Sequence, residues 1–312
     1  MTRDKTCLLV QPIHEVGRAL LRDNGIEPVL CPSPDMTTVA GMIRDVDAVI
    51  TRNAGLSASA FAAAERLRVV VVHGTGHNAV DKAAARARGV MVCNTPGVNA
   101  QSVAELALGL ILAAARSLVA ADAAARAGDA RFRDAGRFTE LAGKTALIVG
   151  WGGIGARLGR MLAAGFGMEV LVHSPNAPEV AGFERVGLEH GLARADLVSL
   201  HTPMREETRG LINAARLGAM KPGAILVNTA REGLVEEAAL AAALHAGHLG
   251  AAGLDVYEEP LSEALRGAPR LVLTPHVGAS TEDALRAVAL GAAGHVVTAL
   301  AGGVPATRIN KS

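Results

Sequence analysis

Short apolar runs alternate along the chain with longer Ala-rich segments of helical character. In the first hundred residues the candidate strands are CLLV (7–10), AVIT (48–51), VVVV (69–72) and VMVC (90–93). Gly25 and Gly89 end two of the helical segments between these runs, as helix-stop glycines do. Near-continuous apolar strands that alternate with helices predict a parallel sheet with both faces covered.

A second alternating series occupies the middle of the chain. Its candidate strands are TALIVG (145–150), EVLVHS (169–174), LVSLHT (197–202), AILVNTA (224–230), GAAGLDVY (250–257) and RLVLTPH (270–276). We expect about seven strands here, which is a complete doubly wound unit. With 312 residues, the chain is long enough for about two domains.

Two further segments predict helices. Residues 99–128 are predicted to form one long helix, in which Ser102 and Glu105 have the spacing of a capping box. This segment is apolar around much of its circumference, which indicates burial between domains or between subunits. Residues 282–303 are predicted to form one more amphipathic helix.

Composition narrows the class of protein. The 31 basic and 30 acidic residues are dispersed along the chain, which disfavours nucleic-acid binding and a disordered acidic tail. Cys7, Cys31 and Cys93 fit neither a disulfide framework nor a zinc site, and no metal site is expected. The apolar stretch in the N-terminal segment MTRDKTCLLVQP is too short for a signal peptide. No uninterrupted apolar run has the length of a membrane span. We therefore expect a cytoplasmic protein.

The segment GWGGIG (150–155) has the pattern G-x-G-x-x-G between a candidate strand and a candidate helix, as a dinucleotide-binding turn requires. Gly150 allows the tight turn, Gly152 lets the backbone approach a pyrophosphate, and Gly155 lets the helix pack on the strand. The amides near Gly153 and Ile154 would face the anion, with the helix dipole behind them. The alternative is a glycine-rich turn without a ligand.

The same fingerprint expects an acidic residue at the end of the next strand, where Ser174 stands instead. Without that carboxylate the ribose 2′-hydroxyl loses its acceptor, and the repulsion of a 2′-phosphate is relieved. No arginine occupies position 175 or 176, and Arg205, after the third strand, is the candidate cation. We therefore expect NAD(P) as the cofactor, and the missing carboxylate at Ser174 favours NADP.

Several motifs, in order and spacing, resemble the D-isomer-specific 2-hydroxyacid dehydrogenases. This family includes glyoxylate/hydroxypyruvate reductases and phosphoglycerate dehydrogenases. The motifs are NTPGVNAQSVAELALGLILAAAR, ELAGKTALIVGWGGIG, LHTPMREETRGLIN, LVNTAREGLVEEAAL, AGLDVYEEP and LVLTPHVGAS, and the resemblance covers nearly the whole chain.

The resemblance implies an α/β protein of two Rossmann-like doubly wound domains. A nucleotide-binding domain (99–281) is inserted in a discontinuous, flavodoxin-like substrate domain (1–98 plus 282–312), with the active site in the cleft between them. The family is usually dimeric, with the long helix after Asn99 supplying much of the contact. Because the chain ends at residue 312, we expect no feedback control of the kind seen in longer phosphoglycerate dehydrogenases.

By the family's motifs the catalytic residues are Arg231 of NTAREG, Glu259 of DVYEEP and His276 of TPHVG. Reduction of a 2-keto acid needs a hydride at the carbonyl carbon, a proton at its oxygen and a hold on the carboxylate. A histidine suits the proton transfer because its ordinary pKa lies near working pH, and Glu259 would orient the ring. Arg231 offers a planar fork of donors to the carboxylate and places charge where the alkoxide develops. Taken singly, each of the three is as easily a surface or loop residue.

Further residues are assigned to ligands. The resemblance gives the cofactor Gly150, Gly152, Gly153, Ile154, Gly155, Ser174, His201, Thr202, Pro203, Thr208, Thr229, Ala230, Asp255 and Gly278. Asp255 would meet the nicotinamide carboxamide, and the alternative is a buried structural carboxylate. The substrate candidates are Arg52, Asn53, Arg231 and an anion-binding nest of amides at Gly74, Thr75 and Gly76, for which a plain tight turn is the alternative.

We expect an NAD(P)-dependent D-2-hydroxyacid dehydrogenase that works mainly as a reductase on a small 2-keto acid, as glyoxylate/hydroxypyruvate reductases do. The alternative enzyme is a short-type D-3-phosphoglycerate dehydrogenase, which needs cations in its cleft beyond Arg52. The alternative from another class is a dinucleotide-sensing, corepressor-like binding protein.

Overall fold

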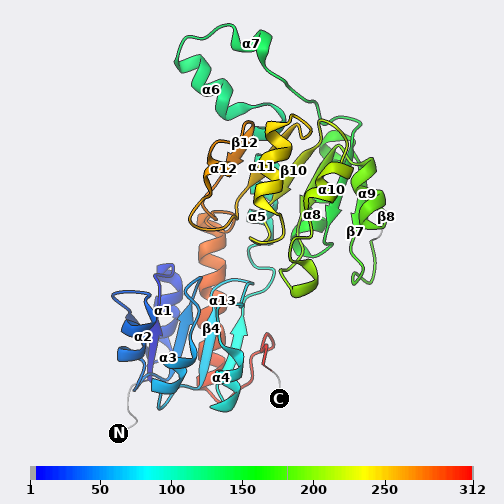
Figure 1. Ribbon diagram of the computed structural model, residues 1–312. Helices are drawn as coiled ribbons and strands as arrows, with labels where there is room; N and C mark the ends of the chain where they lie inside the picture. Colours follow the sequence, from blue (N-terminus) through cyan, green and yellow to red (C-terminus); the bar gives the residue numbers. More distant parts are fainter. Residues whose placement is uncertain (1–4, 181, 311–312) are drawn as a thin grey trace. The chain divides into compact units, whose positions relative to one another are not determined.

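The computed structural model describes residues 5–180 and 182–310, and the chain divides into two compact units (Figure 1). Unit 1 ends its first part at Asn99 and resumes at Ser280, so its fold is interrupted by unit 2, Ala100–Ala279. The first four residues of the segment MTRDKTCLLVQP lie outside the described residues.

Unit 1 contains a parallel sheet in the order β2-β1-β3-β4-β5, which is the flavodoxin-like order. Its strands are β1 (Lys5–Leu9), β2 (Ile26–Leu30), β3 (Ala48–Thr51), β4 (Val69–Val72) and β5 (Met91–Asn94). The four predicted strands are confirmed, and β2 was missed. Pro28 interrupts the apolar pattern of β2, and it is tolerated because β2 is an edge strand that pairs only with β1.

Helices cover both faces of this sheet. They are α1 (Glu15–Asp23), α2 (Met36–Met42), α3 (Ala58–Ala63), α4 (Lys82–Ala87) and α13 (Glu282–Leu300). α1 and α13 cover one face, and they approach so closely that a Cβ on Gly17 would lie 2.9 Å from the Cβ of Ala289. α13 is long and apolar enough to cross a membrane, but Ala292, Val296 and Leu300 pack on the strands of unit 1, as in a core helix.

Unit 2 contains a parallel sheet in the order β12-β11-β10-β9-β6-β7-β8. Its strands are β6 (Thr145–Val149), β7 (Glu169–His173), β8 (Glu184–Arg185), β9 (Leu197–Leu200), β10 (Ile225–Asn228), β11 (Ala251–Leu254) and β12 (Leu271–Leu273). The strand order reverses between β6 and β9, the point where dinucleotides bind in doubly wound folds. The predicted fold class, two doubly wound α/β units, is confirmed. β8 was missed because its two residues are charged and exposed.

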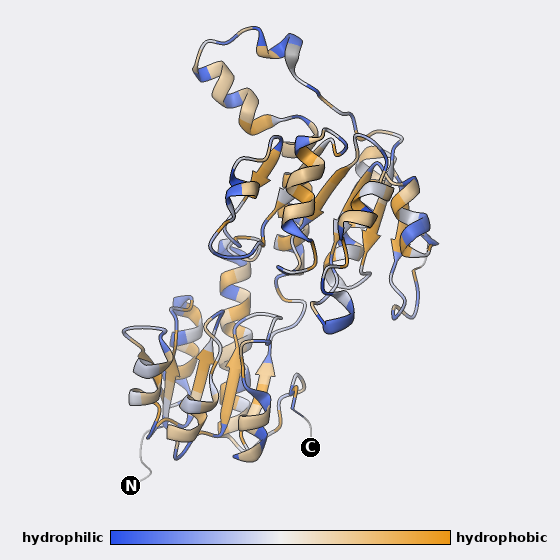
Figure 2. Ribbon diagram, viewed as in Figure 1, coloured by the Kyte–Doolittle hydropathy of each residue, from blue (hydrophilic) through white to orange (hydrophobic). Residues whose placement is uncertain are grey.

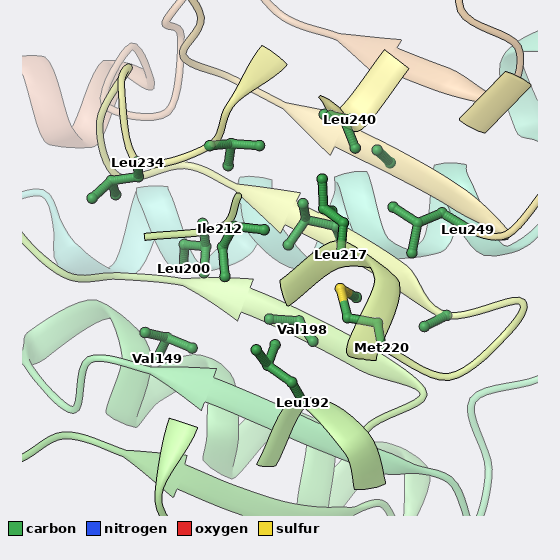
Figure 3. Close-up of a cluster of buried hydrophobic side chains, with 14 of the residues drawn as sticks. Val149, Leu192, Val198, Leu200, Ile212, Leu217, Met220, Leu234, Leu240 and Leu249 are labelled. Carbon is green, nitrogen blue, oxygen red and sulfur yellow. The ribbon is translucent and has the colours of Figure 1, made fainter. Parts of the chain in front are cut away.

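Two apolar layers enclose the second sheet, and both units are apolar along their strands (Figure 2). The helices are α5 (Ala100–Ala115), α6 (Leu118–Arg126), α7 (Phe132–Ala135), α8 (Gly153–Phe166), α9 (Leu188–Arg194), α10 (Ala214–Ala219), α11 (Glu237–His245) and α12 (Glu263–Arg266), with a 3-10 turn η1 (Glu206–Thr208). Figure 3 shows Leu192 of α9 and Leu217 of α10 against Val198 and Leu200 of β9.

The prediction of one helix over 99–128 was wrong. α5 ends at Ala115, Ser117 has the left-handed φ of 48°, and a separate helix α6 follows that contains no buried residue. The broad apolar surface of α5 is explained by burial inside its own unit, because Ala107 and Ile111 pack in the core with α8 and the sheet.

Candidate active site

The loops that follow the strands of unit 2 begin at the same level along one edge of the sheet. Val149 pairs with Leu200, Leu200 with Asn228, Asn228 with Leu254, and Leu254 with Leu273; these are the last residues of β6, β9, β10, β11 and β12. The loops that carry the predicted catalytic and nicotinamide residues therefore start side by side at the carboxyl edge, where ligands bind in open α/β sheets.

The glycine turn after β6 is built as the fingerprint requires. Gly150 has φ 100°, and a Cβ there would lie 2.6 Å from the carbonyl oxygen of His201. A Cβ on Gly155 would lie 2.1 Å from the carbonyl oxygen of Gly150. At Gly152, in contrast, a Cβ would meet no atom within 4 Å. The fold itself therefore needs the first and third glycines, while the second leaves open space.

α8 begins at Gly153, so the amides of Gly153 and Ile154 lie in its first turn beside this open space. A helix N-terminus with exposed amides suits the pyrophosphate of a dinucleotide.

Two polar atoms that follow neighbouring strands are buried without a hydrogen-bond partner in the described part of the chain. They are Nδ1 of His201 and Oγ1 of Thr229. The other ring nitrogen of His201 contacts Oγ of Ser199 at 2.9 Å, and burial lowers the pKa of His201 to about 3, so the ring is neutral at working pH. A buried polar atom without a partner is costly unless a ligand supplies one. Both the turn and these two atoms fit a bound dinucleotide.

The remaining residues after β9 form a compact turn. The hydroxyl of Thr208 accepts a hydrogen bond from the amide of Arg205 at 2.7 Å and donates one to the carbonyl of Pro203 at 2.9 Å. Thr202 is half-buried at the start of this turn. The contacts of Thr202, Pro203 and Thr208 with a cofactor stay predictions.

Arg231 is a half-buried cation without an ion pair to any described residue. The side chain of Asn228 shapes its loop, because it accepts from the amide of Ala230 at 2.9 Å and donates to the carbonyl of Arg231 at 2.8 Å. Burial lowers the pKa of Arg231, and the nearby carboxylate of Glu232 opposes that shift. A guanidinium in this position has donors for an anion, and the contact of Arg231 with a substrate stays a prediction.

Asp255 holds the loop that carries His276. Its Oδ1 accepts from the hydroxyl of Thr274 at 2.6 Å and from the amide of Val277 at 2.9 Å, and its Oδ2 accepts from the amide of Gly278 at 2.9 Å. The loop turns sharply, since His276 has φ 54°. This arrangement matches the alternative of a buried structural carboxylate, and a contact of Asp255 with a nicotinamide stays a prediction.

Both the amide and the carbonyl of Gly278 form hydrogen bonds within the protein. Its amide donates to Asp255, and its carbonyl accepts from the hydroxyl of Ser102 at 2.6 Å. The backbone of Gly278 thus braces the His276 loop, and its predicted contact with the cofactor stays a prediction.

Glu259 lies in the loop after β11 with an exposed side chain. A neighbouring residue anchors this loop: the amide of Glu258 donates to Oε1 of Glu237 at 2.6 Å. Burial, with the nearby carboxylates of Glu258 and Glu232, raises the pKa of Glu237. No hydrogen bond joins Glu259 to His276 among the described side chains, so the structure brings the two loops to one edge but does not pair the side chains.

The substrate candidates of unit 1 also follow strands. After β3, the amide of Arg52 donates to Oε1 of Gln11 at 3.1 Å, and Asn53 is exposed. After β4, Gly74 has φ 135°, but its amide donates to Oγ1 of Thr95 at 2.8 Å. The predicted nest of three amides is therefore corrected to two, those of Thr75 and Gly76. Contact of these residues with a substrate stays a prediction.

Sequence reasoning missed the residues that shape the loops. Asn228 stands inside the motif LVNTAREG, yet nothing in that motif indicates its hydrogen bonds. The predicted capping box of Ser102 and Glu105 was wrong, because α5 begins at Ala100 and the hydroxyl of Ser102 donates to the carbonyl of Gly278 instead. A buried amide or hydroxyl next to a catalytic loop is the available signal, because such groups need partners.

The chain is similar in sequence and in structure to known 2-hydroxyacid dehydrogenases and keto-acid reductases. Residues 108–278 match the NAD binding domain of the D-isomer specific 2-hydroxyacid dehydrogenases. The D-3-phosphoglycerate dehydrogenase of Mycobacterium leprae is 44% identical over 276 residues, which cover 86% of this chain and 52% of that protein. The chain thus spans about half the length of these relatives.

Two other similar proteins match along almost their whole length. The glyoxylate reductase of Thermococcus litoralis is 36% identical over 292 residues, which cover 89% of this chain and 88% of that protein. The crystal structure of an NADPH-dependent glyoxylate/hydroxypyruvate reductase from Sinorhizobium meliloti, in complex with NADP and malonate, superposes with a TM-score of 0.87 at 30% identity, covering 98% of this chain and 97% of that one.

Proposed function

The chain belongs to the D-isomer specific 2-hydroxyacid dehydrogenase family, and from this premise we propose that it transfers hydride between a nicotinamide dinucleotide and a small 2-keto acid, mainly as a reductase. The observation that carries the proposal is Arg231, a half-buried cation without an ion pair among the described residues, at the sheet edge that also carries the His276 loop. The carboxylate of a keto acid would supply the missing negative charge.

Each residue has a role in this proposal. A reduced dinucleotide, when bound at the glycine turn after β6, would supply the hydride for the carbonyl carbon. Arg231 holds the substrate carboxylate and stabilises the negative charge that develops on the keto oxygen. Protonated His276 gives its proton to that oxygen during reduction, and neutral His276 takes it back during oxidation.

Two carboxylates support His276. Asp255 holds its loop through hydrogen bonds to Thr274, Val277 and Gly278. Glu259 orients the imidazole, which requires rotation of an exposed side chain, a motion that is fast on the timescale of turnover.

We propose NADPH as the preferred cofactor. Ser174 offers a hydroxyl where NAD-selective turns carry a carboxylate, so no fixed negative charge repels a 2′-phosphate there. The similar reductase of Sinorhizobium meliloti is NADPH-dependent.

We also propose a homodimer, formed through the segment that contains α6 and α7 rather than through α5. Leu118, Val119 and Phe138 are 51%, 63% and 44% exposed, although they are large apolar residues. A helix of nine residues without a buried side chain is marginal on its own, so α6 needs a partner to pack against. A second copy of the same segment supplies an apolar partner.

Oxidation of 3-phosphoglycerate is the second candidate activity. It is favoured by the 44% identity to the Mycobacterium leprae enzyme and by Arg52, which has no ion pair among the described residues. A phosphate and a carboxylate together call for several cations. Because Arg52 is the one clear candidate in unit 1, this activity ranks second.

A panel of 2-keto acids tested with NADH and NADPH distinguishes these candidates. We expect turnover of glyoxylate or hydroxypyruvate, faster with NADPH. Turnover of phosphohydroxypyruvate alone would favour the second candidate. Absence of turnover, together with capture of peptides in a dinucleotide-dependent manner, would contradict the proposal and favour a corepressor-like protein.

A further inference from the structure

The short strand β8 brings an arginine to the turn that begins at Ser174. Arg185 pairs with Val172 of β7, and its Nη2 donates to the carbonyl oxygen of Ala177 at 2.5 Å. The amide of Ala177 in turn donates to the carbonyl of Ser174 at 3.3 Å. The guanidinium is therefore held against the one turn whose first residue decides between a ribose hydroxyl and a phosphate.

The charge of Arg185 is not compensated by the acidic residues around it. Glu184, its neighbour on β8, forms an ion pair with Arg194 at 2.8 Å, and Arg194 also pairs with Glu169 of β7 at 2.7 Å. Arg185 forms no ion pair with any described residue, including Glu179 in the same turn. The guanidinium of Arg185 is therefore an uncompensated positive charge at the edge of the sheet beside Ser174.

Arg205, the cation expected from the sequence, is a poorer candidate. Its Nη1 lies 3.6 Å from Oε1 of Glu207, and its backbone amide is held by Thr208 in the turn after β9. The expectation that Arg205 supplies the positive charge is therefore not supported by its contacts.

We propose that Arg185 binds the 2′-phosphate of NADP(H) and sets the preference for the phosphorylated cofactor. The inference rests on the proposed function. A phosphate monoester carries nearly two negative charges at neutral pH, and a guanidinium has donors to spare after one hydrogen bond to a carbonyl. Ser174 adds a neutral donor at the same turn.

Binding of nucleotide fragments tests the proposal without catalysis. 2′,5′-ADP and 5′-AMP differ only in the 2′-phosphate. Trp151, the single tryptophan, follows Gly150 directly, and its ring packs edge-on against that of Phe183 with 5.1 Å between the ring centroids. Its fluorescence therefore reports binding beside the glycine turn. We expect the unaltered protein to bind 2′,5′-ADP at least about tenfold more tightly than 5′-AMP, as a charge-assisted hydrogen bond gives.

Arg185→Gln is the informative variant, because it removes the positive charge while keeping a polar side chain with the same stem to Cδ. We expect it to lose most of the discrimination, about tenfold, with 5′-AMP binding unchanged, and to lower the NADPH preference in turnover equally. Arg160→Gln is the matched control, since Arg160 is an exposed arginine in the second half of α8.

Three results would overturn the proposal. They are equal binding of the two nucleotides by the unaltered protein, equal weakening of both by Arg185→Gln, and loss of discrimination in Arg205→Gln instead. In each case 5′-AMP still binds, so the proposed dinucleotide function survives. Binding of neither nucleotide would contradict the proposed function as well.

Discussion

At the residue scale, the proposed chemistry depends most on the unpaired cation Arg231. Replacing it with alanine removes both the hold on the carboxylate and the charge that stabilises the alkoxide. We expect kcat/KM to fall by at least about 10²–10³-fold. Arg231→Lys keeps the charge but loses the planar fork, and we expect only partial recovery. Fluorescence titration of Trp151 with NADPH serves as the control, because dinucleotide binding should be unchanged; full activity of Arg231→Ala would refute the assignment.

The direction of proton transfer gives a second residue-scale prediction. Reduction consumes a proton from His276, and oxidation returns one to it. We therefore expect the rate of keto-acid reduction to peak at lower pH than the rate of hydroxy-acid oxidation, and His276→Ala to remove most activity in both directions. Full pH–rate profiles measured in both directions check this, and coincident optima would argue against His276 as the proton carrier.

The sequence predicted those site residues that belong to a short motif. It did not predict the hydrogen bonds that join segments far apart in the chain. GWGGIG identified the turn after β6, and its glycines have the steric roles that the pattern implies. The hydrogen bonds of Asp255 reach residues 19 to 23 positions later, a relation that no spacing rule describes. The role of Asp255 in supporting the His276 loop therefore emerges only from the folded chain.

At the element scale, strands buried on both faces were predictable because apolar residues dominate them, as in β4, whose sequence is VVVV. The exceptions are β2 and β8, two of the four edge strands, which lack that pattern because β2 contains Glu27 and Pro28 and β8 consists of two charged residues. The break between α5 and α6 was also missed. Ser117 is an unremarkable residue in a helical sequence, and its left-handed conformation depends on the packing of the segments around it.

The glycine turn provides an element-scale prediction with a built-in control. Gly155→Ala places a methyl group 2.1 Å from the carbonyl of Gly150, so α8 must move away from β6. We expect a loss of about 1–3 kcal/mol in the free energy of unfolding.

Gly152→Ala is the control, because its methyl group meets no atom within 4 Å, and the free energy of unfolding should change by less than about 1 kcal/mol. NADPH binding should weaken, because the methyl group fills the space for the pyrophosphate. Urea unfolding and Trp151 titration measure the two effects, and equal destabilisation by both variants would contradict this account.

At the scale of the whole molecule, two buried histidines make stability depend on pH. Burial lowers the pKa of His201 in unit 2 to about 3, and burial with the charge of Arg52 lowers that of His73 in unit 1 to about 4. The unfolded chain protonates both near pH 6.5, so it binds more protons than the folded chain below that pH. Stability is therefore full above pH 6.5 and falls as the pH drops toward 4.

We expect each of these histidines to cost roughly 1–2 kcal/mol of stability between pH 6.5 and 5. Urea midpoints measured across that range check the slope. His201→Asn should flatten it, and His245→Asn, which alters an exposed histidine of α11, should not. An unchanged slope in His201→Asn would mean that this ring does not stay neutral in the folded state.

The exposed apolar residues of α6 determine the state of assembly in our proposal. Val119 is 63% exposed and Leu118 is 51% exposed, and a charge at either position would have to be buried in the dimer without a partner. We expect the double variant Leu118→Glu, Val119→Glu to be monomeric by light scattering at micromolar concentration, with an unchanged far-UV spectrum. Leu290→Glu is the matched control, because Leu290 is 43% exposed on α13 in unit 1. If the double variant stays dimeric while Leu290→Glu dissociates, the interface lies on unit 1 and not on α6.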